Sequence, residues 1–299
     1  MLVEYLTIGR TNGIAKNSSP YCILKLVNAD ETISVAVWDV DPTAGPQIGQ
    51  LVRFHNITDR DGKKSAGVRD MVTGPMCQEG HPLYDLIPRP IKREVWDKTL
   101  QNLIAFSKHP RLIDIIREFG EKLYEPYSKY PAATAMHHAF PGGLLNHTWQ
   151  MLHMLEGLYP VLPYPQSVHI ERCILACLFH DYGKLCEYNR DGETQEDMYL
   201  LGHIFISAHT LQNVLEEKFA ETPGDTRSIK PENREEIKRI IHCVLAHHGE
   251  KEFGSPVVPC SQEAIIVNMV DNLSAKTENA ETTGNMEYSA CLGTHVIKD

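Results

Sequence analysis

Alternation of apolar and polar side chains dominates the N-terminal part of the chain. Thr32 to Trp38 alternates polar or small residues with apolar ones, as expected of a β-strand that buries one face. Similar runs, separated by clusters of Gly, Pro, Asn and Asp, occupy residues 2–9, 21–28, 32–40, 50–58 and 65–72. The charged stretch Asp59 to Lys64 predicts a turn before the last run. These short strands predict a small closed β-barrel within residues 1–75.

The period of the pattern changes after a segment rich in proline and glycine. This segment has no regular period and predicts a linker at 76–92. Beyond it, apolar residues recur at helical spacing, and we expect helices between 95 and 119 and at 143–158, 167–181, 198–220, 231–248 and 261–277. The fold class is therefore multidomain α and β. A small β-barrel at 1–75 precedes an all-α domain at 93–277 and a polar C-terminal tail at 278–299.

Length and composition agree with about two folded domains. The chain has 299 residues, and its 42% hydrophobic and 23% charged residues lie in the globular range. No run approaches the roughly 18 apolar residues of a membrane-spanning helix, and Met1 to Tyr5 lacks a basic segment followed by an apolar one. The eight cysteines form no C-x-x-C pair and are interpreted as reduced, mostly buried thiols. We expect a cytoplasmic protein with no membrane partner, and leave a homo-oligomer open.

The net charge of −10 argues against indiscriminate binding of polyanions, which depends on many Lys and Arg contacts. The charge is unevenly distributed, because residues 1–75 hold equal numbers of basic and acidic side chains. The acidic excess therefore lies entirely in 76–299, where we look for chemistry. Bound divalent cations would supply positive charge that this formal sum omits.

Five places in the predicted helices pair an imidazole or a carboxylate with an apolar helix. They are His147, His180–Asp181, His203, His247–His248 and Asp271. A single histidine in a helix is more often a hydrogen-bonded structural residue than a metal ligand. For each position taken alone, the structural interpretation therefore competes with that of a ligand. His153 and His209 lie six residues after candidate ligands, where a regular helix points them elsewhere, so we interpret both as structural.

The His180–Asp181 dipeptide changes this balance. Ile174 to Phe179 is an apolar run that should be buried, and a carboxylate at its end is costly unless it is paired or bound to a metal. Adjacent helical residues point about 100 degrees apart, so the two side chains can flank one ion or bridge two. Imidazole nitrogen with carboxylate oxygen suits Mn, Fe, Ni, Co, Zn or Mg, and the ligand types select none of them.

The order of these residues resembles that of the HD superfamily of metal-dependent phosphohydrolases. His147, His180–Asp181 and Asp271 follow its H…HD…D pattern. The segments around His203 and His247 resemble the subset that binds two metals. The resemblance implies two divalent cations, manganese among the candidates, with Asp181 as the bridge and with the ligands His147, His180, Asp181, His203, His247 and Asp271, and His248 as an optional addition.

The resemblance also implies the catalytic residues, which are Asp181 and Lys184. A water shared by two cations loses a proton near neutral pH and becomes a nucleophile, while the cations stabilise charge on the phosphoryl oxygens. One turn beyond the dipeptide, the Lys184 ammonium could reach a non-bridging phosphate oxygen. A solvated lysine at a helix end is the competing interpretation.

Together with the N-terminal strands, the motifs resemble the YhaM-type 3′-to-5′ exoribonucleases, which join an OB-fold nucleic-acid-binding domain to an HD domain. The most specific pieces are His137 to His147, His247 to Pro256, and Asp271 to Lys276. The OB likeness rests on strand spacing and on Ser34 to Val40, which ends in Val37-Trp38-Asp39-Val40. The resemblance implies an OB-like domain at 1–75 and an HD domain at 93–277 that shortens single-stranded RNA, with single-stranded DNA left open as a substrate.

The candidate substrate contacts are His138, Lys184, Arg60 and Lys63. His138 follows His137 and precedes a Pro-Gly-Gly turn that could bring an imidazole to phosphate, with a structural role given equal weight. Arg60 and Lys63 lie in the charged turn, which is either a solvated tip or a nucleic-acid contact.

Four aromatic residues of the N-terminal domain could stack on bases. For Tyr5, Tyr21 and Phe54, packing in the core competes with this role, and we expect Trp38 to fill the barrel. In the helical domain, Phe253 to Pro256 either lines the substrate cleft or connects two helices.

Two other functions stay open at this stage. An HD phosphohydrolase of small nucleotides suits the negative charge better, although His247-His248-Gly249 is not followed by the Gly-Tyr-Pro signature of cyclic-dinucleotide hydrolases. A nucleic-acid-binding module with a non-catalytic HD scaffold is the alternative outside enzymology, and the complete set of candidate ligands disfavours it.

Overall fold

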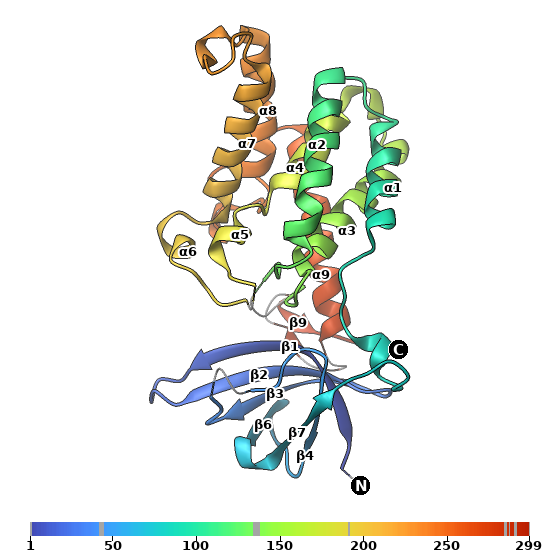
Figure 1. Ribbon diagram of the computed structural model, residues 1–299, viewed down its shortest axis with the longest axis vertical. Coiled ribbons are helices and arrows are strands. Elements are labelled where there is room, and N and C mark those ends of the chain that lie inside the picture. The colour runs from blue at the N-terminus through green and yellow to red at the C-terminus, as the bar shows by residue number, and fades with distance from the viewer. Residues whose placement is uncertain are drawn as a thin grey trace. The chain divides into compact units, whose positions relative to one another are not determined.

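The structure, a computed structural model, describes residues 2–41, 45–133, 138–190, 192–283, 286, 288–289 and 292–298. The chain divides into two compact units (Figure 1). The sheet unit comprises Met1–Arg89, Ala133–Phe140 and Lys276–Asp299, and the helical unit comprises Pro90–Ala132 and Pro141–Ala275. Within the described part of the chain, every helix is too short or too polar to cross a membrane.

Strands β1 to β7 of the sheet unit form one sheet in the order β5-β6-β3-β2-β1-β4-β7. Their bounds are β1 Glu4–Ile14, β2 Pro20–Val27, β3 Thr32–Trp38, β4 Gln50–Phe54, β5 Thr58–Arg60, β6 Lys63–Gly67 and β7 Met71–Met76. Strands β3 and β6 are parallel, and the other pairs are antiparallel. The last predicted run is thus split between β6 and β7 by a short 3₁₀ helix, Val68–Asp70.

The predicted closure of this sheet into a barrel is wrong, because β5 and β7 stand at opposite ends of the strand order and do not pair within the described residues. Two features explain the open sheet. Strand β5 has three residues, all exposed, so it offers little edge to pair with. Strand β7 contains Pro75, which has no N–H to donate to a further strand.

The alternation that predicted β3 also decides which of its side chains are buried. Ile33, Val35 and Val37 lie in the core of the sheet unit, together with Leu24 and other residues of β2. Trp38 has the opposite parity and is 39% exposed, so our expectation that it fills the barrel is wrong. Among the other aromatic residues, Tyr5 and Phe54 are buried in the core, whereas Tyr21 packs beside Trp38.

The expected linker is folded against the sheet unit. Cys77 and Leu83 are buried in a cluster with Leu6 and Leu51, and a short 3₁₀ helix follows at Tyr84–Leu86. Proline and glycine therefore interrupt the hydrophobic period here without preventing side-chain burial.

The helices of the chain are α1 Arg93–Ile104, α2 Pro110–Tyr127, α3 Gly143–Leu158, α4 Ile170–Phe179, α5 Lys184–Glu187, α6 Asp197–Leu200, α7 His203–Phe219, α8 Pro231–Leu245 and α9 Gln262–Thr282. The prediction for 143–158 matches α3, and the expected helix 198–220 is divided into α6 and α7. Gly202, with a φ of 74°, makes this division, since that backbone conformation interrupts a right-handed helix. Helix α9 continues past 277 into the expected tail, where β8 Tyr288–Ser289 pairs with β9 Thr294–His295.

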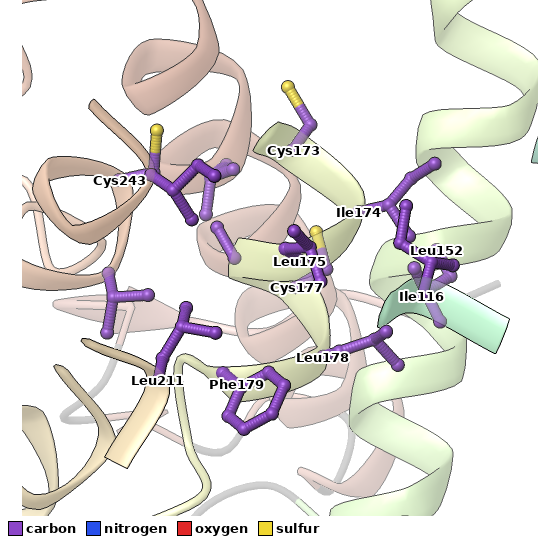
Figure 2. Packing of buried hydrophobic residues seen from close by; sticks show 14 of the residues in the cluster. Ile116, Leu152, Cys173, Ile174, Leu175, Cys177, Leu178, Phe179, Leu211 and Cys243 are labelled. Carbon is purple, nitrogen blue, oxygen red and sulfur yellow. The ribbon is translucent and has the colours of Figure 1, made fainter. Parts of the chain in front are cut away.

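Helix α4 is the centre of the helical core. All ten of its residues are buried, and Figure 2 shows its apolar side chains between Ile116 and Leu152 on one side and Leu211 and Cys243 on the other. The interpretation of Cys173 and Cys177 as buried thiols is confirmed, and burial raises the pKa of both. Because α4 is packed on all sides, the positions of the next two residues, His180 and Asp181, are fixed.

A buried ion cluster joins α4 to its neighbours. The Arg172 Nε donates to Glu236 Oε1 of α8 at 2.8 Å, and Arg172 Nη1 donates to Glu263 Oε1 of α9 at 3.3 Å. Glu263 also accepts from the His169 backbone N–H at 3.0 Å, just before α4 begins. These contacts tie three helices that converge on the same region.

Replacing Arg172 with methionine should destabilise the protein, because Glu236 and Glu263 would lose their cation in a poorly solvated position. Removing one partner of a buried pair costs about 3–5 kcal/mol, and we expect the free energy of unfolding from urea titration to fall by about this much. Arg227→Met is the control, since that guanidinium is exposed beside Asp225 and its removal should have no measurable effect. Equal losses in the two variants would contradict the structural role of Arg172.

Candidate metal centre

The helical unit brings three of the predicted ligands together at the end of α4. His147 Nε2 lies 3.1 Å from His180 Nε2 and 3.7 Å from Asp181 Oδ2, and His180 Nε2 lies 3.2 Å from the same oxygen. Asp271 joins them from α9, with Oδ1 3.1 Å from His147 Nε2. We call His147, His180, Asp181 and Asp271 the first group.

The turn before α3 positions His147. Gly142 has a φ of 89° at the N-terminus of α3, a left-handed conformation that favours glycine. A Cβ there would lie 2.7 Å from the Pro90 side chain and 3.0 Å from the Ser128 carbonyl oxygen. The close approach fixes the start of α3, and His147 follows on the buried face of the first turns.

A second group forms on the other side of Asp181. His203 comes from the start of α7, and His247 and His248 follow the end of α8. His203 Nε2 lies 3.3 Å from His248 Nε2 and 3.6 Å from Asp181 Oδ1, and His247 Nε2 lies 4.0 Å from that oxygen. The Asp181 carboxylate thus turns Oδ2 toward the first group and Oδ1 toward the second.

Backbone carbonyls orient three of the imidazole rings. The Nδ1 atoms of His180, His247 and His248 donate to the carbonyl oxygens of Cys177, Val244 and Phe253 at 2.9, 2.6 and 2.8 Å. Since a carbonyl oxygen only accepts, Nδ1 carries the hydrogen in each ring, and Nε2 is left to bind an ion. The segment beginning at Phe253 therefore supports the second group directly.

Glu187, which sequence reasoning missed, orients His203. Its Oε1 lies 3.1 Å from His203 Nδ1 and also accepts from the His203 backbone N–H. Glu187 is buried at the end of α5, sixteen residues before His203, and no spacing rule connects them. Ser274 orients His147 in the same way, with its Oγ 2.9 Å from His147 Nδ1. Ser274 lies one turn after Asp271 on α9, and this spacing could have identified it as a residue of the centre.

The charges in the centre are strongly coupled. Burial raises the pKa of Asp181, but the Lys184 ammonium and His180 outweigh burial and hold that pKa well below its usual value. Burial likewise raises the pKa of Asp271, and the adjacent His147 and His180 rings lower it further than burial raises it. Both carboxylates are therefore ionised at neutral pH.

Two histidines of the second group, His247 and His248, are shifted toward the uncharged form. Burial, followed by the nearby His180 and His248 rings, lowers the pKa of His247 well below its usual value. Burial and the adjacent His203 lower the pKa of His248. Neutral imidazoles with free Nε2 atoms are the form that binds a metal ion.

Two buried atoms indicate that the centre fits a cation. Among the described residues, neither Asp181 Oδ1 nor His247 Nε2 has a hydrogen-bond partner. An unsatisfied buried carboxylate oxygen and an unsatisfied imidazole nitrogen are costly, and both are metal ligands. The ligand-like groupings His147–His180–Asp181 and His203–His247–His248 each bring three donor atoms within 4.8 Å of one another. Nitrogen and oxygen donors in this mixture suit a divalent transition metal or magnesium.

Lys184 is a buried member of the centre. Its Nζ lies 2.7 Å from Asp181 Oδ2, so the alternative of a solvated lysine at a helix end is wrong. Burial lowers the pKa of Lys184, but Asp181 reverses this effect and the pKa is raised overall. The ammonium therefore stays charged beside the carboxylate.

The other predicted substrate contacts belong to the sheet unit. His138 is buried, with Nε2 3.8 Å from Glu278 Oε2, and His137 lies outside the described residues. Arg60 and Lys63 pair across the exposed turn that joins β5 to β6. Elsewhere, His153 and His209 are exposed on their helices, where His153 contacts Glu156 and His209 contacts Asn213.

Comparison with known proteins agrees with this centre. A family model described as the HD domain matches residues 144–276. A Bacillus licheniformis protein named 3′-5′ exoribonuclease YhaM is 30% identical over 284 residues, which cover 91% of this chain and 84% of that protein. Proteins of the same name from Bacillus velezensis and Bacillus subtilis are each 29% identical over 91% of this chain, and cover 83% and 84% of their own lengths. The comparison with solved structures gives no match.

The chain is an HD-domain metal-dependent phosphohydrolase. Its similarity to these relatives extends beyond the HD domain into the N-terminal sheet. It belongs to the family of the 3′-5′ exoribonuclease YhaM proteins.

Removing the Glu187 carboxylate should weaken metal binding at the second group. Because the His203 ring would lose its orienting partner, we expect Glu187→Ala to lower the affinity for that metal by about 10–100-fold in a titration against a chelating dye. Glu187→Gln keeps an acceptor and should recover most of the affinity. Glu196→Ala, which removes an exposed carboxylate nearby in sequence, is the control. If Glu187→Ala binds metal as tightly as the control, Glu187 does not position His203.

Proposed function

We propose that this protein removes nucleotides from the 3′ end of single-stranded RNA, with two divalent cations and a shared water. The observation that carries the proposal is the Asp181 carboxylate, whose two oxygens face two separate groups of imidazoles. The relatives named as 3′-5′ exoribonucleases support the direction of degradation and the substrate. Single-stranded DNA is a second polymer that the same chemistry could cleave.

In this proposal the first group would hold one cation, and the second group together with Asp181 would hold the other. When bound, such a pair lowers the pKa of a shared water and offsets charge on the phosphoryl oxygens. Lys184 adds a side-chain positive charge at this place, 2.7 Å from Asp181, and is suited to a non-bridging phosphate oxygen. The carbonyl and carboxylate partners of the rings keep each Nε2 directed inward.

The sheet unit offers a place for single-stranded RNA to stack. The rings of Tyr21 and Trp38 lie 5.1 Å apart on facing positions of β2 and β3. Gly13 of β1 lies opposite Tyr21 of β2, and a Cβ at Gly13 would lie 2.4 Å from the Tyr21 ring. Exposed aromatic side chains bind bases of any sequence by stacking, as single-strand-binding surfaces do.

Basic residues of the same sheet support this surface. Arg60 ends β5 and Lys63 begins β6, on either side of an exposed turn, and β6 pairs with β3, the strand that carries Trp38. We assign them to contacts with the RNA backbone. We leave His138 out of the substrate contacts, because its buried ring lies against Glu278 of the sheet unit, with Nε2 3.8 Å from Oε2.

Hydrolysis of small nucleotides is the second candidate, and the net charge of −10 favours it, since a long polyanion is repelled by an acidic surface. The two candidates share the metal centre and differ in the need for the sheet unit. A substrate comparison therefore separates them.

The direct experiment incubates the protein, loaded with Mn²⁺, with single-stranded RNA labelled at its 5′ end. We expect a ladder of products shortened from the 3′ end, and no ladder after chelation. Asp181→Asn should lower the rate by about 100-fold or more, as loss of an electrostatic catalytic group does, and should also lower the bound metal in elemental analysis. Asp114→Asn, at an exposed carboxylate of α2, is the matched control.

Two results would overturn the proposal. Turnover of free nucleotides with intact RNA under every divalent metal would favour the small-nucleotide hydrolase. A ladder of equal intensity from Asp181→Asn would remove the metal centre from the reaction.

Trp38→Ala should weaken RNA binding without harming the metal centre. Loss of one stacked base costs about 1–3 kcal/mol, so we expect the Kd for a labelled single strand, measured by anisotropy with chelator present, to rise about tenfold or more. Tyr164→Ala removes an exposed aromatic side chain from the helical unit and should leave the Kd unchanged. An unchanged Kd for Trp38→Ala, with an unchanged melting temperature, would exclude this face from RNA binding.

A further inference from the structure

A cavity of about 410 Å³ lies between α7 and α8 in the helical unit. Its volume is in the range of small-molecule sites. Much of its lining is apolar and comes from α8 and the residues around it, namely Ile229, Ile237, Ile241, Leu245 and Val257. None of the proposed metal ligands lines it, and neither the metal centre nor the stacking surface uses it.

The polar lining of the cavity carries a surplus of one positive charge. Arg234 and Lys238 are exposed and lie one turn apart on α8, so they face the same side of the helix. The Arg234 guanidinium also donates to the Thr226 carbonyl oxygen, and Lys238 Nζ lies 3.8 Å from Oε2 of Glu235, an exposed acid outside the lining. Glu216 of α7 is the one acid in the lining, and it already accepts from Gln212 Nε2 at 2.8 Å. His242, one turn beyond Lys238, is neutral because burial lowers its pKa.

We propose that this cavity binds a small amphiphilic monoanion, with an apolar or aromatic body against the isoleucines and leucine and a carboxylate at Arg234 and Lys238. The apolar lining supplies the burial, and the two cations supply charge-assisted hydrogen bonds. A neutral molecule of the same shape lacks the charge-assisted hydrogen bonds and therefore binds more weakly. A dianion gains less than a monoanion because Glu216 opposes it.

The position of the cavity couples it to the second group. Helix α7 begins at His203, and α8 ends at Leu245, two residues before His247. Figure 1 shows these helices running side by side, and the cavity lies between them. A ligand that separates or clamps α7 and α8 changes the relative positions of His203 and His247. Occupancy therefore alters metal affinity at the second group, and metal alters ligand affinity by the same factor.

Cys260 provides a reporter for the cavity that does not depend on activity. Its Sγ lies 3.2 Å from Nε2 of His242, a residue of the lining, and its backbone N–H donates to the same atom at 3.1 Å. Among the seven described cysteines, Cys260 alone is classed as exposed. A ligand against His242 limits the access of an alkylating reagent to this thiol.

The test uses 4-phenylbutyrate as the probe and the neutral 4-phenylbutan-1-ol as its matched comparison. Calorimetry should give an affinity for the carboxylate at least about tenfold higher than for the alcohol, the contribution expected of a charge-assisted hydrogen bond. Peptide mass spectrometry should show slower alkylation of Cys260 by iodoacetamide when the carboxylate is present. Arg234→Gln with Lys238→Gln should reduce the affinity to that of the alcohol.

Two further variants make the result decisive. Arg239→Gln removes a cation of α8 that does not line the cavity and that shares Glu235 with Lys238, so the affinity should fall far less than in the double variant. Ile241→Trp fills the cavity and should abolish binding of both compounds at an unchanged melting temperature. Equal affinity for acid and alcohol, or equal losses from Arg239→Gln and the double variant, would overturn the site.

Metal titration tests the coupling separately. With the probe at saturation, the affinity for the second metal equivalent should change by about fivefold or more. Binding of the probe with no change in metal affinity would overturn the coupling and leave the site established. This coupling rests on the metal centre, whereas binding of the probe does not, so failure of RNA hydrolysis would affect neither measurement.

Discussion

The structure depends on one buried carboxylate. Asp181 is held at the end of an apolar helix, where an unpaired charge is costly, and the structure offsets that cost from two directions. Oδ2 faces His180 and the Lys184 ammonium, whereas Oδ1 faces His203 and His247 without a hydrogen bond among the described residues. A buried carboxylate with one satisfied oxygen and one unsatisfied oxygen between imidazoles fits a divalent cation. The apolar packing of α4 is what makes this arrangement rigid.

The helices that carry the metal centre are held in place at both of their ends. Helix α4 is buried on all sides, and the Arg172 cluster fixes its first turns to α8 and α9. The rings that surround Asp181 are then oriented by carbonyl groups at helix ends and by Glu187. Because helix ends leave carbonyl oxygens unpaired, the close of α4 and of α8 supplies acceptors where the histidines need them. The carbonyl oxygens at the ends of α4 and α8 therefore serve as acceptors for the imidazole rings of the metal centre.

Much of this could be predicted from the sequence, and the reasons differ by element. The helical period of 143–158 and the apolar run before His180 are local signals, and the structure has helices there. The order of His147, His180–Asp181 and Asp271 predicted a convergence that the structure contains. The division at Gly202 was missed because one glycine within a helical pattern is often tolerated.

The remaining errors arise from long-range structure. Closure of the sheet depends on how β5 and β7 meet, which a period along the chain does not encode. Trp38 is exposed because its position in β3 has the opposite parity to the buried residues. The alternation in the sequence already indicates this, but the expected barrel led us to place Trp38 inside it. The contact between Glu187 and His203 joins two segments across a loop, so no motif identifies it.

The proposed function requires that Asp181 bridge two cations. A crystal structure of the protein soaked in Mn²⁺, with anomalous scattering recorded at the manganese edge, tests it most directly. The account predicts two anomalous peaks, one within coordination distance of each Asp181 oxygen and each surrounded by its own group of imidazoles. A single peak remote from Asp181, or no peak at full metal concentration, would contradict it.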